Sequence, residues 1–302
     1  MTNKMRSILR SVKKTDLVWR YGSNLSPTFE YKINKIHLSD VEKDIINKLN
    51  ADGIAVTSID ELFADDSEFR VLDAATRALL DDRKQEIDGL KSMANDPAIG
   101  DKTFNLEMLG SELIFDSDSI FARFALNSRL LNIANAYFQM YAKLRYYNVW
   151  NTFASQGSAR ESQLWHFDRE DNYILKLFLY LEDVDEGTGP FTYAPGTHRK
   201  GRFHSIEPEF FMEGGVRRTT DEQMNAVFPR EKWKRGTGKK GTIIFADTRG
   251  FHKGGEARTK DRLMYTCMYT SRASESKELL KVPSNIETNT LTNEQLRNLG
   301  IR

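Results

Sequence analysis

Histidine is scarce in this sequence, and two of its five histidines stand in surroundings that suit a metal site. His166 and Asp168 are separated by one residue in LWHFDRED, directly before the apolar run YILKLFLYL. On an extended chain, side chains two residues apart point to the same face, so an imidazole and a carboxylate are presented together. His252 follows another apolar run in GTIIFADTRGFHKGG. We therefore predict His166, Asp168 and His252 as catalytic metal ligands.

Two imidazoles and one carboxylate leave several coordination positions of a metal open. Such a set suits non-haem Fe(II), whose free positions take a bidentate cosubstrate and O₂. A structural metal site has no such vacancy, because protein ligands fill it. The spacing of His166 and Asp168 alone is a weak signal, but its combination with His252 predicts a catalytic Fe(II) centre.

A possible anchor for the cosubstrate follows the third ligand. Arg262 opens the apolar run RLMYTCMYT. A buried arginine is costly unless paired, and its rigid fork matches a carboxylate bidentately. A dicarboxylate such as 2-oxoglutarate would satisfy it. The alternative is a surface arginine that pairs with Asp261 or Glu256.

Lys176 is a second candidate for cosubstrate binding. It shares strand parity with Phe178 and Tyr180, and a lysine that points into an apolar core needs an anionic partner. The alternative places Lys176 in solvent, while the leucines that alternate with it face the core.

The elements that must position these residues change in character along the chain. From about residue 140, short apolar runs alternate with turn residues, which is typical of an all-β sandwich or barrel. The runs are AKLRYYNVWNTF, YILKLFLYL, PFTYAP, GTIIFAD and RLMYTCMYT. The fold class is therefore predicted as mainly β with flanking helices.

Residues 1–139 are predicted to be a mostly helical region that wraps this β core. Ser39 and Glu42 have the spacing of a capping box, and Gly53 marks a helix end. The predicted elements are a helix over about 40–51, a β run over 54–57, a helix over 66–90, a loop over 91–103, and helices over 119–126 and 129–139.

The whole chain is predicted to form one domain, 1–302. Its β core spans 140–272 and is interrupted by an insertion at about 200–240, and a tail follows over 273–302. The insertion is rich in basic residues, which are Arg217, Arg218, Arg230, Lys232, Lys234 and Arg235. We expect a solvated loop there; the alternative is contact with an anionic substrate, such as a CoA or nucleotide-sugar conjugate.

Composition bounds the class of partner. The 302 residues include 44 Lys+Arg and 43 Asp+Glu, which argues against a dedicated nucleic-acid binder and favours a small-molecule substrate. No apolar stretch suits a membrane span or a secretory signal, so a cytoplasmic location is expected. The basic residues before Asp16 leave a transit peptide or a membrane-surface helix as alternatives. The oligomeric state stays open.

Three stretches, WHFD, LYLEDVDEGTGPFTYAPGTHR and FADTRGFHKGG, resemble the phytanoyl-CoA dioxygenase-like branch of the Fe(II)/2-oxoglutarate oxygenases. The resemblance spans about 40–272. It implies a double-stranded β-helix, or jelly-roll, core. It also implies iron held by His166, Asp168 and His252, and Arg262 on the distal carboxylate of 2-oxoglutarate.

The function that this resemblance implies is an Fe(II)- and 2-oxoglutarate-dependent dioxygenase, which uses O₂ and releases succinate and CO₂. Hydroxylation of a small organic molecule or conjugate is expected. In related halogenases a small residue takes the place of the carboxylate ligand, and this chain keeps the carboxylate as Asp168, which disfavours halogenation. Gly254 departs from the family, whose members often carry a hydroxyl residue there. The alternatives are a metal-dependent β-barrel enzyme without 2-oxoglutarate and a catalytically silent binding protein.

Overall fold

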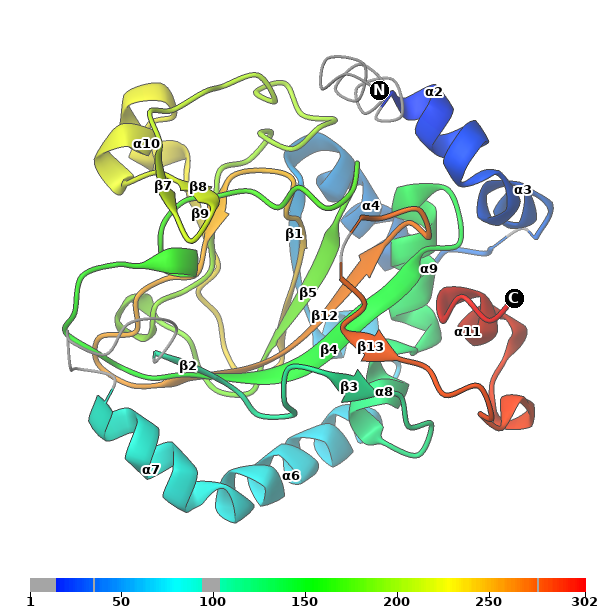
Figure 1. The fold of residues 1–302 in the computed structure, drawn as a ribbon, viewed down its shortest axis with the longest axis horizontal. Coiled ribbons are helices and arrows are strands. Elements are labelled where there is room, and N and C mark those ends of the chain that lie inside the picture. Colours follow the sequence, from blue (N-terminus) through cyan, green and yellow to red (C-terminus); the bar gives the residue numbers. More distant parts are fainter. Residues whose placement is uncertain (1–14, 35, 94–103, 276) are drawn as a thin grey trace.

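The computed structural model describes residues 15–34, 36–93, 104–275 and 277–302 (Figure 1). Its centre is a six-stranded antiparallel sheet in the order β1-β10-β5-β12-β4-β2. These strands are Ile54–Ser58 (β1), Thr242–Asp247 (β10), Leu175–Tyr180 (β5), Arg262–Thr270 (β12), Lys143–Thr152 (β4) and Asn105–Glu107 (β2). A three-stranded sheet consists of His252–Lys253 (β11), Thr192–Tyr193 (β6) and Lys234–Arg235 (β9).

The two faces of the large sheet bury different side chains, because neighbours along a strand point to opposite sides. In β5, Leu177 and Leu179 lie in the core shared with the helices, whereas Phe178 lies in a second core. That second core also contains Phe191 and Tyr193, from the segment of the smaller sheet. The two facing sheets form the jelly-roll core, and the predicted fold class is confirmed.

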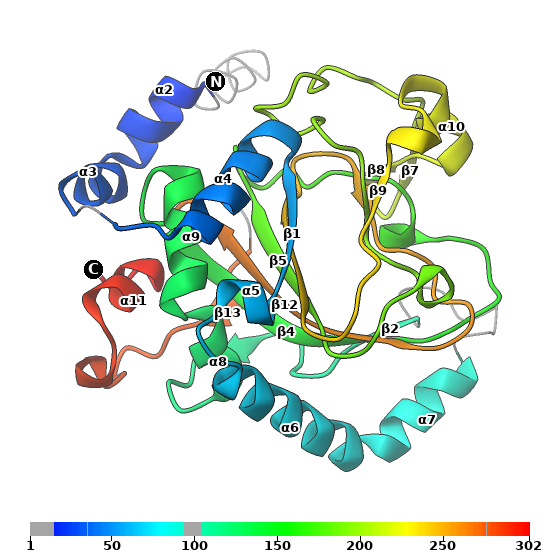
Figure 2. The same cartoon turned by 180° about the vertical axis from the view of Figure 1, so that it is seen from behind.

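Helices cover the outer face of the large sheet, and Figure 2 shows this layer from behind. The main ones are Asp40–Asp52 (α4), Ser67–Asp82 (α6), Lys84–Met93 (α7), Ile120–Ala125 (α8) and Ser128–Phe138 (α9). The shorter helices are Asp16–Val18 (α2), Leu25–Ile33 (α3), Ile59–Leu62 (α5), Asp221–Val227 (α10) and Asn293–Asn298 (α11). The remaining strands are Leu113–Ile114 (β3), Phe211–Glu213 (β7), Val216–Arg218 (β8) and Leu280–Lys281 (β13). Single turns lie at Trp19–Ser23, Glu161–Gln163, Glu186–Thr188, Arg230–Lys232 and Thr288–Thr290. None of the described helices is long and apolar enough to cross a membrane.

The turn from α4 into β1 follows the predicted signals. Ser39 and Glu42 form the reciprocal capping box, and the backbone at Gly53 has a φ of 77°, which favours glycine. A Cβ atom at Gly53 would lie 2.3 Å from the Tyr193 hydroxyl oxygen and 2.7 Å from Nδ1 of His198. The turn therefore packs directly against β6 and the chain that follows it.

The prediction of one helix over 66–90 is wrong, because the chain turns at Arg83 and divides this segment into α6 and α7. The Arg83 side chain donates hydrogen bonds to the backbone oxygens of Glu107 and Met108, and it also pairs with Glu86. These contacts compensate for the interrupted helix. The predicted loop over 91–103 is wrong over 91–93, where α7 continues; its remainder lies outside the described residues.

The last thirty residues are not a simple tail. Strand β13 pairs in parallel with β3, and a capping box between Thr292 and Gln295 starts α11. Asn298 is fully buried and donates a hydrogen bond to Asn135 of α9. Contacts with distant parts of the chain therefore fix this segment, which a reading of local polarity missed.

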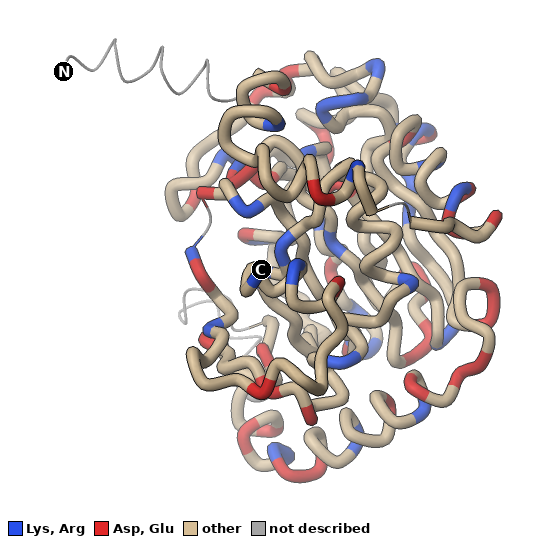
Figure 3. The backbone as a smooth tube through the Cα atoms, turned by 90° about the vertical axis from the view of Figure 1, so that its right-hand side faces the viewer, with Lys and Arg blue, Asp and Glu red and all other residues tan. Residues whose placement is uncertain are grey.

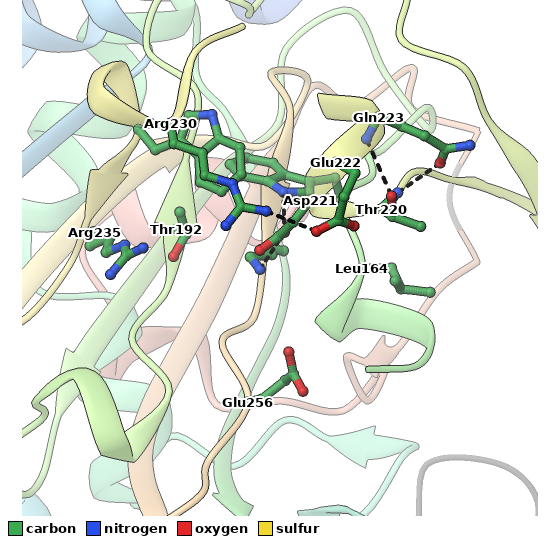
Figure 4. Close-up of polar contacts among 12 residues, drawn as sticks. Leu164, Thr192, Thr220, Asp221, Glu222, Gln223, Arg230, Arg235 and Glu256 are labelled. Carbon is green, nitrogen blue, oxygen red and sulfur yellow. Dashed lines mark hydrogen bonds and ion pairs between the residues drawn. The ribbon is translucent and has the colours of Figure 1, made fainter. Parts of the chain in front are cut away.

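The insertion at 200–240 is also more ordered than a solvated loop. It contains the hairpin β7–β8, helix α10 and strand β9. Figure 4 shows the capping box between Thr220 and Gln223 that starts α10. Met224 and Trp233 from this region pack against the buried Trp165. The insertion thus covers the chain that leads into the predicted metal ligands.

Charges of both signs are interspersed over the molecule, as Figure 3 shows. This arrangement matches the near-equal numbers of basic and acidic residues in the sequence. The basic N-terminal segment, for which a transit peptide or membrane-surface helix was an alternative, lies outside the described residues up to Lys14.

Candidate metal centre

Backbone pairing brings the three predicted ligands together. His166 and His252 form an isolated β-bridge, in which each backbone N–H donates to the other's carbonyl oxygen over 2.9 Å. The backbone N–H of Asp168 donates to Thr248 O over 2.8 Å. The candidate ligand atoms of the three side chains all lie within 4.8 Å of one another. This proximity is what a shared metal ion requires.

Backbone carbonyls orient both imidazoles. Nδ1 of His166 lies 2.8 Å from the backbone oxygen of Leu164, and Nδ1 of His252 lies 3.0 Å from that of Gly250. Figure 4 labels Leu164. Because a carbonyl oxygen only accepts, each Nδ1 carries the proton and each Nε2 keeps its lone pair. Burial lowers the pKa of His166 and lowers that of His252 to about 4. Both rings are therefore neutral donors to a metal.

Lys176 lies next to the carboxylate ligand. Its Nζ is 2.7 Å from Oδ2 of Asp168, and both side chains are at least five-sixths buried. Burial alone would raise the pKa of Asp168, but Lys176 and the two imidazoles lower it overall. Burial alone would lower the pKa of Lys176, but Asp168 raises it overall. The pair is thus ionised, and the alternative of a solvent-facing Lys176 is wrong.

Arg262 is buried at the start of β12, in register with Thr152 of β4. One terminal nitrogen, Nη1, lies 3.5 Å from Gly255 O, the other, Nη2, lies 3.4 Å from the Thr152 hydroxyl, and Nε has no partner. Among the described residues, no carboxylate lies within ion-pair distance of this guanidinium. Burial lowers the pKa of Arg262. A buried cation with only two long contacts retains donors for an anionic ligand.

The alternative of a surface Arg262 paired with a neighbouring acid is wrong. Asp261 pairs instead with Lys91, and Glu256 pairs with Arg258. The two acids are therefore committed elsewhere, although they stand next to Arg262 in the sequence or six residues before it.

A cavity of about 610 Å³ joins these features, a size typical of small-molecule sites. All five predicted site residues contribute to its wall: His166, Asp168, Lys176, His252 and Arg262. Aromatic side chains of Trp150, Phe178 and Phe191 also line it. The cavity therefore combines charged groups at one place with apolar walls around them.

Sequence reasoning missed Thr152, and it named Arg218 only within a basic insertion that could contact an anionic substrate. The Thr152 hydroxyl beside Arg262 supplies a hydroxyl group at a site where Gly254 offers none, and a Cβ atom at Gly254 would lie 3.7 Å from Nη2 of Arg262. Arg218 reaches the cavity from the insertion. The pairing of β12 with β4 places Thr152 beside Arg262, and the path of the insertion places Arg218 at the cavity. Neither the register nor this path can be read from the local sequence.

The profile of the phytanoyl-CoA dioxygenase (PhyH) family matches residues 49–264. The chain belongs to this family. The matched region contains all five predicted site residues, and the resemblance inferred from the motifs is confirmed. No curated protein matches the sequence.

Solved structures of other proteins are similar in fold at low sequence identity. EctD from S. alaskensis in its apo form is 17% identical, with a TM-score of 0.50, and the match covers 83% of this chain and 91% of that chain. The epimerase SnoN in complex with Fe³⁺, alpha-ketoglutarate and nogalamycin RO is 15% identical, with a TM-score of 0.49 and coverages of 76% and 83%. EctD from S. alaskensis with 2-oxoglutarate and 5-hydroxyectoine is 17% identical, with a TM-score of 0.49 and coverages of 83% and 92%.

Proposed function

We propose that this PhyH-family protein is an Fe(II)- and 2-oxoglutarate-dependent dioxygenase that hydroxylates a small organic molecule or conjugate, with release of succinate and CO₂. One observation carries the proposal. A buried guanidinium without a carboxylate partner, that of Arg262, lines the same cavity as an open set of His166, Asp168 and His252. A closed structural metal site would need neither open positions nor this arginine.

The ligand set fits Fe(II). Two neutral imidazoles with free Nε2 atoms and one ionised carboxylate converge within 4.8 Å. Two histidines and one carboxylate on one side of a metal are the donor set of non-haem Fe(II) oxygenases. Asp168, His166 and His252 would hold the ion, and the hydrogen bonds from Nδ1 to backbone carbonyls would keep both rings oriented.

The other half of the cavity fits 2-oxoglutarate. The Arg262 fork would hold the distal carboxylate bidentately, with the Thr152 hydroxyl beside it. Family membership supports the same choice of cosubstrate. The role of Lys176 in binding 2-oxoglutarate stays a prediction, because its ammonium contacts Asp168.

Each residue then has a separate task in the reaction. Bound Fe(II) would supply open positions for 2-oxoglutarate and O₂ and the redox chemistry of C–H hydroxylation. Arg262 fixes one end of the cosubstrate, so that its other end is directed at the ligand set. Phe178 and Phe191 exclude water from the side of the cavity next to His252. Lys176 keeps Asp168 ionised.

Anaerobic Fe(II) titration with and without 2-oxoglutarate tests the proposal. A weak visible metal-to-ligand charge-transfer band is expected only when both are present. His166→Ala should abolish the band, and Arg262→Ala should raise the 2-oxoglutarate requirement at least about tenfold, since it removes a charge-assisted hydrogen-bonded pair. Arg258→Ala is the matched control, because Arg258 is paired with Glu256 outside the cavity.

The other outcomes identify the alternatives. Iron binding without the band would contradict the role of 2-oxoglutarate and favour a metal-dependent β-barrel enzyme that works without it. Failure to bind iron would contradict the metal site and favour a catalytically silent binding protein. An equal rise in the 2-oxoglutarate requirement of Arg258→Ala would remove the specific role of Arg262.

A further inference from the structure

A second cavity, of about 290 Å³, lies beside the metal cavity and shares Phe167 and Arg218 with it. Part of its wall comes from the β7–β8 hairpin and the segment before it, which belong to the insertion. The rest comes from the chain around the metal ligands, including Trp165 and Phe251. The two cavities are therefore neighbours across one arginine and one phenylalanine.

The second cavity is strongly basic. Four arginines line it, and the lining contains a single carboxylate, that of Glu207. The arginines are Arg199, Arg217, Arg218 and Arg249. This concentration contrasts with the mixed charges over the rest of the molecule (Figure 3). Like charges along one lining repel one another, and an anion bound among them would offset this repulsion.

Two of these arginines have donors that no described residue satisfies. Arg218 is 8% exposed, and its Nε and Nη1 atoms make no hydrogen bond. Its nearest acid is Glu213, whose carboxylate oxygen is 3.7 Å away. Nε of Arg249 is likewise buried without a partner, although its Nη1 donates to Asp168 O. Buried guanidinium donors without acceptors are costly, and an anionic ligand would satisfy them.

The remaining wall is apolar and mostly aromatic. Trp165, Phe167, Phe210 and Phe251 contribute to it. The guanidinium of Arg217 lies 4.1 Å from the centre of the Phe210 ring, which holds this exposed arginine at the rim. Inorganic anions gain nothing from such walls. The lining therefore suits an organic molecule that carries a negative group.

We propose that this second cavity binds the phosphate ester group of the substrate, whose apolar part extends past Phe167 into the metal cavity. Arg199 is paired with Asp16, but Arg217, Arg218 and Arg249 still outnumber Glu207 in the lining. This excess suits a phosphate ester, which carries up to about two negative charges. Arginine forks match phosphate oxygens bidentately. Arg218 would contact the ester group from between the two cavities. The reaction at the metal rests on the proposed function, whereas binding of the ester group does not.

Calorimetric titration of the metal-free protein tests the site with three probes: phenyl phosphate, inorganic phosphate and benzyl alcohol. Phenyl phosphate is expected to bind at least about tenfold more tightly than either of the others, because it uses both the arginines and the aromatic walls. Arg217→Gln and Arg218→Gln should each weaken its binding about tenfold. Arg217 is exposed, so its replacement should leave the fold intact. Arg217→Gln therefore tests the site even if replacement of the buried Arg218 disturbs folding.

Arg202→Gln is the matched control. Arg202 is an exposed arginine 4.8 Å from the centre of the Phe203 ring, as Arg217 is stacked on Phe210, but it does not line the cavity. The Arg202→Gln variant should bind phenyl phosphate with the affinity of the wild type. Absence of phenyl phosphate binding, or an equal loss in Arg202→Gln and Arg217→Gln, would overturn the proposal.

Two further results separate this proposal from the proposed function. Equal affinity for inorganic and phenyl phosphate would indicate a site for free anions and overturn the assignment to an organic ester. In the protein loaded with Fe(II) and 2-oxoglutarate, phenyl phosphate should shift the visible band, because Arg218 lines both cavities. An unshifted band would overturn the link to the substrate. A protein that binds phenyl phosphate but never shows the band would contradict the dioxygenase function alone.

Discussion

Lys176 and a bound cation would compete for the same carboxylate. In the protein without metal, the ammonium of Lys176 compensates Asp168 over 2.7 Å inside a largely buried site. A divalent ion held by Asp168, His166 and His252 would compensate the carboxylate instead, and it would repel the ammonium. We therefore expect Lys176 to lower the affinity of this site for a divalent ion.

We expect Lys176→Met to lower the stability of the metal-free protein by about 3–5 kcal/mol, the cost of leaving a buried charge unpaired. The rise in melting temperature on addition of Fe(II) should exceed that of the wild type, because the ion then replaces a missing partner. Anaerobic thermal melts with and without Fe(II) measure both effects. A higher 2-oxoglutarate requirement in this variant would instead support the role that sequence reasoning gave Lys176.

Lys253→Met is the control for this comparison. Lys253 pairs with Asp221 over 2.6 Å and its side chain is 12% exposed, similar to that of Lys176, but it does not line the metal cavity. The variant should lose stability without a change in the Fe(II)-induced rise. The same rise in all three proteins would contradict the competition between Lys176 and metal.

His198 is fully buried beside Gly53, and burial lowers its pKa. As pH falls through the unfolded-state value of about 6.5, the unfolded chain binds a proton that the folded protein excludes. Stability should therefore fall as pH falls through 6.5 towards the folded-state pKa, by up to about 1.4 kcal/mol per pH unit from this group. Denaturant unfolding between about pH 8 and 5.5 should show a smaller loss in His198→Gln. His204→Gln, at an exposed histidine, should behave as the wild type.

Sequence reasoning could select His166, Asp168 and His252 as candidate metal ligands, because their spacing and their positions at strand ends are local properties. The unpaired state of Arg262 and the contact between Lys176 and Asp168 depend on residues far away in the chain. Such contacts follow from the tertiary packing and cannot be read from local sequence.

At the level of elements, the turn between α4 and β1 shows how one glycine fixes a junction. Gly53 has a positive φ and no room for a side chain, because Tyr193 and His198 lie against it. Gly110 also has a positive φ, of 87°, but nothing lies within 4 Å of its missing Cβ atom. Substitution of Gly110 therefore introduces backbone strain alone, whereas substitution of Gly53 introduces backbone strain and steric contact.

Gly110→Ala should destabilise the protein by about 1 kcal/mol, the cost of a left-handed alanine. Gly53→Ala should cost about 1–3 kcal/mol more, because the methyl group must displace packed side chains. Unfolding in guanidinium chloride measures both. Equal effects would mean that the packing around Gly53 adjusts without cost.

Elements with a chemical start and stop signal were predicted well, and those stabilised by distant contacts were not. The capping box of α4 is visible in the sequence, and its helix has nearly the predicted bounds. The turn at Arg83 contains no glycine or proline, and its side chain bonds to residues 107 and 108. Strand β2, at 105–107, was not predicted, because only its pairing with β4 makes it a strand.

On the scale of the whole molecule, the predicted wrapping region is part of the central sheet. Strand β1 pairs with β10 through five residues, and β2 forms the other edge beside β4. Helix α9 packs against α4 and holds α11 through Asn135 and Asn298. The proposal that residues 1–302 form one domain is supported by these contacts between distant segments.

We therefore expect a single unfolding transition by differential scanning calorimetry, with calorimetric and van't Hoff enthalpies equal. The physical reason is that neither the region before residue 140 nor the core after it can keep the sheet complete alone. Two separable transitions would contradict the prediction of one domain. Scans of the metal-free and the Fe(II)-loaded protein should both show one transition, with the loaded form melting at a higher temperature.

The central place of β12 in the sheet affects how the chain can fold while it is being synthesised. This strand, at residues 262–270, lies between β5 and β4 and is the last of the six to leave the ribosome. Until it emerges, β1, β10 and β5 can pair with one another, and β4 can pair with β2, but the two groups have no shared strand. Each group then presents an open edge, which is a template for aggregation. The nascent chain is therefore most vulnerable after β10 has been synthesised, while its two half-sheets still await the strand that joins them.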